Sequence, residues 1–165
     1  LEGKLIMSSL QLEQDHERKR LAFDSRWKHL TLQANADLKN GDLIAAGAAY
    51  DLAYHEARMI FAEAWNGHAQ VQPHAPPMLI VSATNAANHR RIRGDKRAAK
   101  EQLLSAVRIF TEALESNRAP ESLKRGCVEH LPRLLADITT HHNDAQLIVE
   151  EAQSAALTYL KKSAH

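Results

Sequence analysis

Apolar residues recur every three or four positions along most of this chain, which is the spacing that places them on one face of an α-helix. No stretch alternates apolar and polar residues strictly, as a half-buried strand does. Together with the positions of the few glycines and prolines, the stripes predict about six helices in three pairs, over about residues 10–66, 77–117 and 120–162. We therefore predict an all-α fold of three antiparallel helical hairpins.

The hinges between the two helices of each pair follow a common pattern. Gly41-Asp42 and Gly94-Asp95 each join a glycine to an aspartate. The glycine can adopt the left-handed conformation that ends a helix. The aspartate can cap the next helix by accepting hydrogen bonds from its free N–H groups. The pattern predicts that the third hinge, Asn143-Asp144, starts the last helix in the same way.

Two residues in the fifth predicted helix need separate comment. Pro132 lies in its middle, where a proline removes one hydrogen bond and clashes with the preceding turn, at a cost of about 3 kcal/mol. We expect a kink near Val128 or a break into two short helices. Cys127 lies on the apolar stripe of this helix, and we interpret it as a small core residue rather than a nucleophile.

The composition fits one globular domain over residues 1–165. Hydrophobic residues make up 44% of the chain and charged residues 25%, which argues against the disordered and membrane classes. We expect residues 1–9 to be flexible or foreign to the natural protein. A lone cysteine excludes an internal disulfide and fits a cytoplasmic location. The net charge of +1 gives the protein no strong overall attraction for nucleic acid or a membrane.

The pattern around the hinges repeats, because small or apolar residues follow each aspartate at similar spacings. The first unit resembles the tetratricopeptide repeat at Trp27, Leu30, Ala34, Gly41, Asp42, Ala46, Tyr50 and Ala53. The second unit matches the same signature at Ala87, Gly94, Asp95, Ala99, Leu103 and Ala106, and the third matches it weakly. The resemblance implies a short, right-handed stack of hairpins. Each hairpin must be longer than the usual repeat of about 34 residues.

The chain is also similar to a small group of uncharacterised bacterial proteins that are built as short tetratricopeptide-like bundles. The matching positions are Trp27, His29, Tyr50, Ala53, Ser82, Asn85, Ala87, Arg91, Gly94-Asp95, Leu103 and Ala106. This similarity extends over most of the chain up to Ala113. It implies a bacterial protein and no known activity.

The tetratricopeptide resemblance implies a concave groove, lined by the first helix of each pair, that commonly holds an extended peptide. The residues expected to bind a partner there are Lys28, Asn35, Lys39, Asn85, Asn88, Arg91 and Arg133. Asparagine can hold a peptide backbone through its donor and its acceptor, and Lys or Arg can hold a carboxylate. Asn35 and Asn85 match two asparagines of the family members that bind chaperone C-termini, whereas Thr31 replaces a lysine of that clamp. We predict a non-catalytic module that binds a protein or peptide partner.

A basic patch from His89 to Lys100 suggests an alternative function. Its cations, besides Arg91 of the groove, are Arg90, Arg93, Lys96, Arg97 and Lys100. They could attract phosphates or an acidic partner, so the alternative is a regulator that binds nucleic acid or another anion. However, helical geometry spreads these cations over two helices, and we expect Asp51 and Glu101 to offset part of their charge. No aromatic residues are interleaved for base stacking, which makes nucleic acid the less favoured partner.

The sequence indicates neither an enzyme nor a cofactor. No two of the ten histidines are spaced at i and i+4 as in a zinc-binding helix, so we predict no metal site. Glycine-rich phosphate loops and nucleophile motifs are missing too. A possible homodimer is a further hypothesis, in which the alanine-rich last helix buries its free face against a copy of itself.

Overall fold

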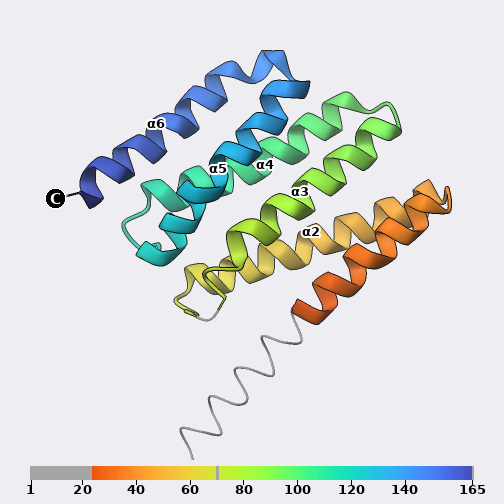
Figure 1. Cartoon of the computed structure of the whole chain (residues 1–165), viewed down its shortest axis with the longest axis horizontal. Coiled ribbons are helices and arrows are strands. Elements are labelled where there is room, and N and C mark those ends of the chain that lie inside the picture. The colour runs from red at the N-terminus through yellow and green to blue at the C-terminus, as the bar shows by residue number, and fades with distance from the viewer. Residues whose placement is uncertain (1–23, 70, 165) are drawn as a thin grey trace, which may run out of the picture.

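The computed structural model describes residues 24–69 and 71–164, and all regular structure in these two ranges is helical. A first helix includes residues 24–39, and the elements that follow are α2 (Leu43–Trp65), α3 (Ala75–Ile92), α4 (Lys96–Glu115), α5 (Glu121–His141), a short 3₁₀ helix (Asn143–Ala145) and α6 (Gln146–Ser163). Figure 1 shows them from the orange helix 24–39, through α2 and α3, to the blue α6, with α5 crossing α4 in this view. The all-α prediction is confirmed. Residues 1–9 and the predicted start of the first helix lie outside the described residues.

The first two hinges form as the sequence predicts. Both glycines, in Gly41-Asp42 and in Gly94-Asp95, have a φ of 81°, which is the left-handed region that favours glycine. Each aspartate carboxylate accepts a hydrogen bond from the N–H three residues further on, at 3.0 Å in the first hinge and 2.9 Å in the second. The glycine therefore ends one helix and the aspartate caps the next.

The third hinge contradicts the prediction that Asp144 caps the last helix. α6 begins after Ala145 without a side-chain cap, and the Asp144 carboxylate accepts instead from Lys100 Nζ at 2.6 Å. This hydrogen bond lowers the pKa of Asp144. The backbone explains the difference, since only glycines have positive φ among the residues described. Asn143 therefore does not make the left-handed turn, and the chain passes through the 3₁₀ helix.

One of the two alternatives predicted for Pro132, a break of the fifth helix into two, is wrong. α5 is a single helix from Glu121 to His141, with the proline inside it. The proline is exposed, whereas Leu131 and Leu134 beside it are buried in the core. Burial of this apolar face holds the helix together across the missing hydrogen bond. The kink near Val128 stays a prediction.

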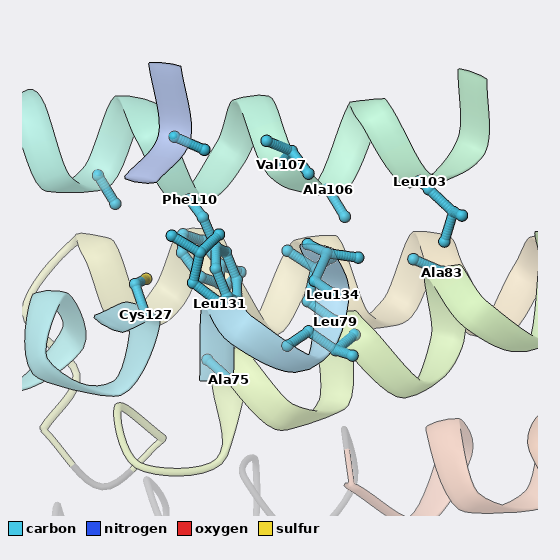
Figure 2. Close-up of a cluster of buried hydrophobic side chains, with 14 of the residues drawn as sticks. Ala75, Leu79, Ala83, Leu103, Ala106, Val107, Phe110, Cys127, Leu131 and Leu134 are labelled. Atoms are coloured by element: carbon cyan, nitrogen blue, oxygen red, sulfur yellow. The ribbon is translucent and has the colours of Figure 1, made fainter. Parts of the chain in front are cut away.

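The main core lies between α3, α4 and α5 (Figure 2). Leu79, Phe110 and Leu134 are fully buried, and they reach the cluster from these three different helices. Phe110 also stacks on Phe61 of α2, with the ring centroids 5.9 Å apart. Cys127 lies in the same cluster, which confirms its interpretation as a core residue. Burial raises the pKa of its thiol and so disfavours the reactive thiolate.

A second, smaller cluster joins helix 24–39 to α2 and α3. Its buried members are Ala34, Ala46, Ala49, Tyr50 and Ala86. The four alanines allow the helices to approach closely. A hydrogen bond between polar groups also joins helix 24–39 to α3, since the indole N–H of Trp27 donates to Ser82 Oγ at 2.7 Å.

α6 packs differently from the other helices, because it contacts chiefly α4 rather than its hairpin partner α5. A pocket of about 1180 Å³ lies between α6 and the adjoining ends of α4 and α5. On its wall, the Tyr159 hydroxyl donates to Glu121 at 3.0 Å. Lys124 Nζ lies 5.8 Å from the centroid of the Tyr159 ring. The third hairpin is therefore splayed open and does not copy the first two.

Gly47 allows the imidazole of His89 to lie directly on α2. A Cβ at Gly47 would stand 2.6 Å from His89 Cε1, and His89 Nε2 is held 2.7 Å from the Leu43 carbonyl oxygen. We expect Gly47→Ala to lower the free energy of unfolding by about 1–3 kcal/mol through overpacking, although alanine has the better helix propensity by about 1 kcal/mol.

Chemical denaturation of four proteins tests this expectation: the wild type, Gly47→Ala, His89→Ala and the double variant. With the imidazole removed, Gly47→Ala should be neutral or stabilising, because only its helix propensity then matters. Equal losses of stability in both backgrounds would contradict the contact.

Candidate functional site

The predicted groove residues come from three neighbouring helices. Helix 24–39 carries Lys28, Asn35 and Lys39, α3 carries Asn85, Asn88 and Arg91, and α5 carries Arg133. The Trp27–Ser82 hydrogen bond connects helix 24–39 to α3, and an ion pair between Arg91 and Asp137 connects α3 to α5. We refer to these seven predicted residues as the groove face.

Four groove-face side chains have unused binding capacity. Lys28, Lys39 and Arg133 are exposed and Asn85 is half-buried, and none of them forms a side-chain hydrogen bond or ion pair within residues 24–69 and 71–164. Asn35 is also exposed, but its Oδ1 accepts from the Tyr50 hydroxyl at 2.7 Å. Only the amide N–H groups of Asn35 are therefore left for a partner.

Arg91 is not a free cation, as the groove hypothesis took it to be, since Asp137 already balances its charge. One guanidinium nitrogen lies 3.2 Å from Asp137 Oδ1, and another donates to Asn88 Oδ1. His141 Nε2 lies 3.6 Å from the same oxygen of Asp137. Sequence reasoning missed this pairing because Arg91 and Asp137 are 46 residues apart, and no local signal connects them.

The same cluster holds polar atoms that are buried without a hydrogen-bond partner. They are Arg91 Nε, Asp137 Oδ2 and His142 Nε2, three of the five such side-chain atoms in the described part of the chain. Buried polar atoms are normally paired, because an unpaired one loses its hydration without compensation. These three atoms therefore cost the fold stability, and their burial keeps them out of reach of a partner on the surface. Sequence reasoning also missed His142, which no periodic pattern marks.

His142 is only 8% exposed. This burial and the positive charge of Arg91 lower the pKa of its imidazole. The folded protein therefore binds a proton at this imidazole less readily than the unfolded chain, in which the group gains a proton near its ordinary pKa of about 6.5. His142 has no effect on the unfolding free energy above the unfolded pKa, and it lowers that free energy as the pH falls from there towards the lower folded pKa.

We expect His142→Gln to flatten the pH dependence of the unfolding free energy between about pH 7.5 and pH 5. Urea denaturation at several pH values measures this slope. His55→Gln serves as the control, because His55 is exposed. A slope unchanged by His142→Gln would show that this residue has no depressed pKa.

The basic patch is divided by ion pairs. Arg90 lies 2.8 Å from Asp51, which is the neutralisation expected from the sequence. Glu101, which was also expected to offset the patch, does not pair with a cation of the patch. It lies 3.8 Å from Arg108 on the same helix instead. Lys100 is the second cation of the patch whose charge is neutralised, because it pairs with Asp144 of the third hinge.

Three cations of the patch are left without a carboxylate partner. Arg93, Lys96 and Arg97 are exposed, and none of them forms an ion pair with any residue that the structure describes. In the same part of the chain, no three His, Cys, Asp or Glu side chains are placed to hold a metal ion. None of the described helices is both long and apolar enough to cross a membrane.

These features define an all-helical protein of stacked hairpins with a polar face on three adjoining helices. The chain belongs to the family described as "Protein of unknown function (DUF2753)", whose sequence model matches residues 25–132. The match includes residues 25–39 of the first helix, α3 and the basic patch, and it ends within α5, before Arg133 and Asp137. No curated protein and no solved structure matches the chain.

Proposed function

We propose that the protein is a non-catalytic interaction module that binds a protein or an extended peptide on its groove face. The observation that carries this proposal is a set of four groove-face side chains without a side-chain partner within residues 24–69 and 71–164: Lys28, Lys39, Asn85 and Arg133. The three cations among them are exposed. A bound peptide would supply their partners from its carboxylates and backbone amides.

The groups of the groove face would have different roles in this binding. Asp137 and Asn88 hold the guanidinium of Arg91 in place, so little side-chain entropy is lost when a partner packs against it. Lys28, Lys39 and Arg133 would bind carboxylates, since their charges are not balanced. Asn85 would hold a backbone amide through its donor and acceptor.

Two further observations support the proposal. The resemblance of the first two hairpins to the tetratricopeptide repeat agrees with peptide binding on the first helix of each pair. A free, buried cysteine fits a reducing compartment such as the bacterial cytoplasm. We therefore propose a cytoplasmic partner.

A pull-down from bacterial lysate with two matched variants tests this function. Lys28→Ala/Lys39→Ala/Arg133→Ala removes three exposed cations from the groove face, and Arg93→Ala/Lys96→Ala/Arg97→Ala removes three from the basic patch. Both variants change the net charge equally, and neither breaks an ion pair within the described residues. A partner retained by the wild type and the patch variant, and lost by the groove variant, is expected. Equal retention by both variants would overturn the proposal.

Anion binding at the basic patch is the alternative function. The free side chains of Arg93, Lys96 and Arg97 favour it, whereas the ion pairs of Arg90 and Lys100 weaken it. Phosphate-driven binding should fall steeply with added salt, since counterion release dominates it. Binding on the groove face should depend on salt only mildly.

Self-association through α6 is a separate proposal. Leu147, Leu157 and Leu160 are exposed on this helix, and a dimer would bury part of them. Sedimentation velocity over a range of concentrations measures it. A monomer at all concentrations would contradict the dimer, and so would a dimer that Leu157→Lys leaves intact.

A further inference from the structure

The outer face of α2 carries an exposed apolar stripe. Ile44, Leu52 and Met59 are 82%, 48% and 42% exposed. Ala48 and Ala62 are exposed as well, and the steps between these positions place all five residues on one side of the helix, with the exposed His55 among them. The opposite side of α2 is buried in the core. Apart from His55, the outer side of α2 is therefore apolar along this stripe, which is unusual for a helix side that faces water.

One end of the stripe opens into a polar pocket. The pocket has a volume of about 400 Å³ and lies between the start of α2 and the α3–α4 hinge. Ile44 and Ala48 form its apolar wall, and Arg90 and Arg93 line the other side. The apolar stripe and the basic patch therefore meet at one place on the surface, although no sequence pattern connects them.

The charges at this end of the stripe favour an acidic ligand. Both carboxylates of the pocket are engaged, since Asp51 pairs with Arg90 and Asp95 caps α4. Arg93 is not engaged, and Lys96 and Arg97 follow it on the same hinge. Within the pocket the two arginines and the two carboxylates balance formally, so the excess positive charge at this end of the stripe comes from Lys96 and Arg97, which an acidic ligand reaching beyond the pocket would meet.

We propose that the α2 stripe and the adjoining cations form a second docking surface, which binds an amphipathic helix of a partner protein. With His55 at the position between Leu52 and Met59, the stripe has the three- and four-residue steps of a seam between two packed helices. From residue 44 to residue 62 it extends about 27 Å along the helix axis, at about 1.5 Å per residue. The bound helix would have about five turns, an apolar face against α2, and acidic residues at the end that lies over Arg93. This surface is independent of the groove face.

Two other occupants fit the charges less well. A membrane surface would require basic residues along the flanks of the stripe, but Asp51 and Glu63 lie on α2 beside Arg58, and the cations gather at one end. A second copy packed antiparallel on the stripe would bring Arg93 near Glu63, whose carboxylate is already paired with His68.

A displayed library of 20-residue helices tests the proposal with the full chain as bait. The library has apolar residues at the seam positions and randomises Glu, Lys and Ser at all others. Enriched clones should carry an excess of Glu at one end. Their binding should weaken about tenfold or more, which is about 1.4 kcal/mol, on Leu52→Lys/Met59→Lys and on Arg93→Glu/Arg97→Glu. The groove variant Lys28→Ala/Lys39→Ala/Arg133→Ala should bind them normally.

Several outcomes would overturn the proposal. They are a library without enriched clones, clones without an acidic end, and clones that bind all variants equally. Clones lost only on the groove variant would show that the groove face, and not the stripe, binds helices. A wild-type dimer that Leu52→Lys/Met59→Lys converts to a monomer would identify the occupant as a second copy. If the wild type instead bound phosphatidylserine vesicles, loss of that binding in both Leu52→Lys/Met59→Lys and Arg93→Glu/Arg97→Glu would identify the occupant as a lipid surface.

Discussion

Phe110→Ala should lower the free energy of unfolding by about 3–5 kcal/mol, the usual cost of truncating a buried aromatic side chain to alanine. Phe110 is fully buried, reaches from α4 into the core between α3 and α5, and stacks on Phe61 of α2. Its removal leaves a cavity that four helices line and cannot easily close. Domains are commonly stable by about 5–15 kcal/mol, so the variant should keep only part of the wild-type stability.

Urea denaturation followed by circular dichroism measures this loss. Ile92→Ala is the control, because Ile92 is an exposed apolar residue on α3 and should change stability by no more than about 0.5 kcal/mol. A loss below about 1 kcal/mol for Phe110→Ala, no larger than that of an average substitution, would contradict the central position of this ring in the core.

Arg91→Ala should have the second large effect, a loss of about 3 kcal/mol in unfolding free energy. The Arg91 and Asp137 side chains are each only 16% exposed, and removing one partner of a buried ion pair leaves an uncompensated charge, at about 3–5 kcal/mol. The lower end applies because both groups keep some contact with water.

A double-mutant cycle separates the ion pair from the packing of these side chains. Arg91→Leu/Asp137→Leu should recover most of the stability that either single leucine variant loses, because two apolar side chains leave no unpaired charge. Additive losses would show that the two side chains do not interact. The result also bears on the site, since Arg91 can be positioned for a partner only if Asp137 holds it.

Much of the fold could be predicted from the sequence because its signals are local. The first two hinges combine a glycine that must turn left-handed with an aspartate that must cap, and both act within a few residues. The third hinge lacks the glycine, and there the prediction was wrong: Asp144 is drawn to Lys100, which is distant in sequence. Of the two alternatives predicted for Pro132, a kink or a break, the break does not occur, because packing of the neighbouring leucines outweighs the lost hydrogen bond.

The candidate site could be predicted only in part. Helical spacing was enough to select exposed polar residues such as Lys28 and Arg133. It could not indicate that Arg91 is neutralised by Asp137, or that buried polar atoms are left unpaired beside them, because these facts depend on how α3 and α5 pack. The stripe on α2 is apolar in the sequence too, but only the structure shows that nothing described covers Ile44.

Site-specific photo-crosslinking in bacterial cells tests the central claim, that the groove face binds a partner, most directly. A benzophenone amino acid would be placed at Lys28, Asn85 and Arg133 on the groove face, and at Glu112, an exposed residue on α4, as the control. The account predicts a common crosslinked partner from the three groove positions and none from position 112. The claim would be contradicted if the groove positions gave no adduct, or only those that Glu112 gives.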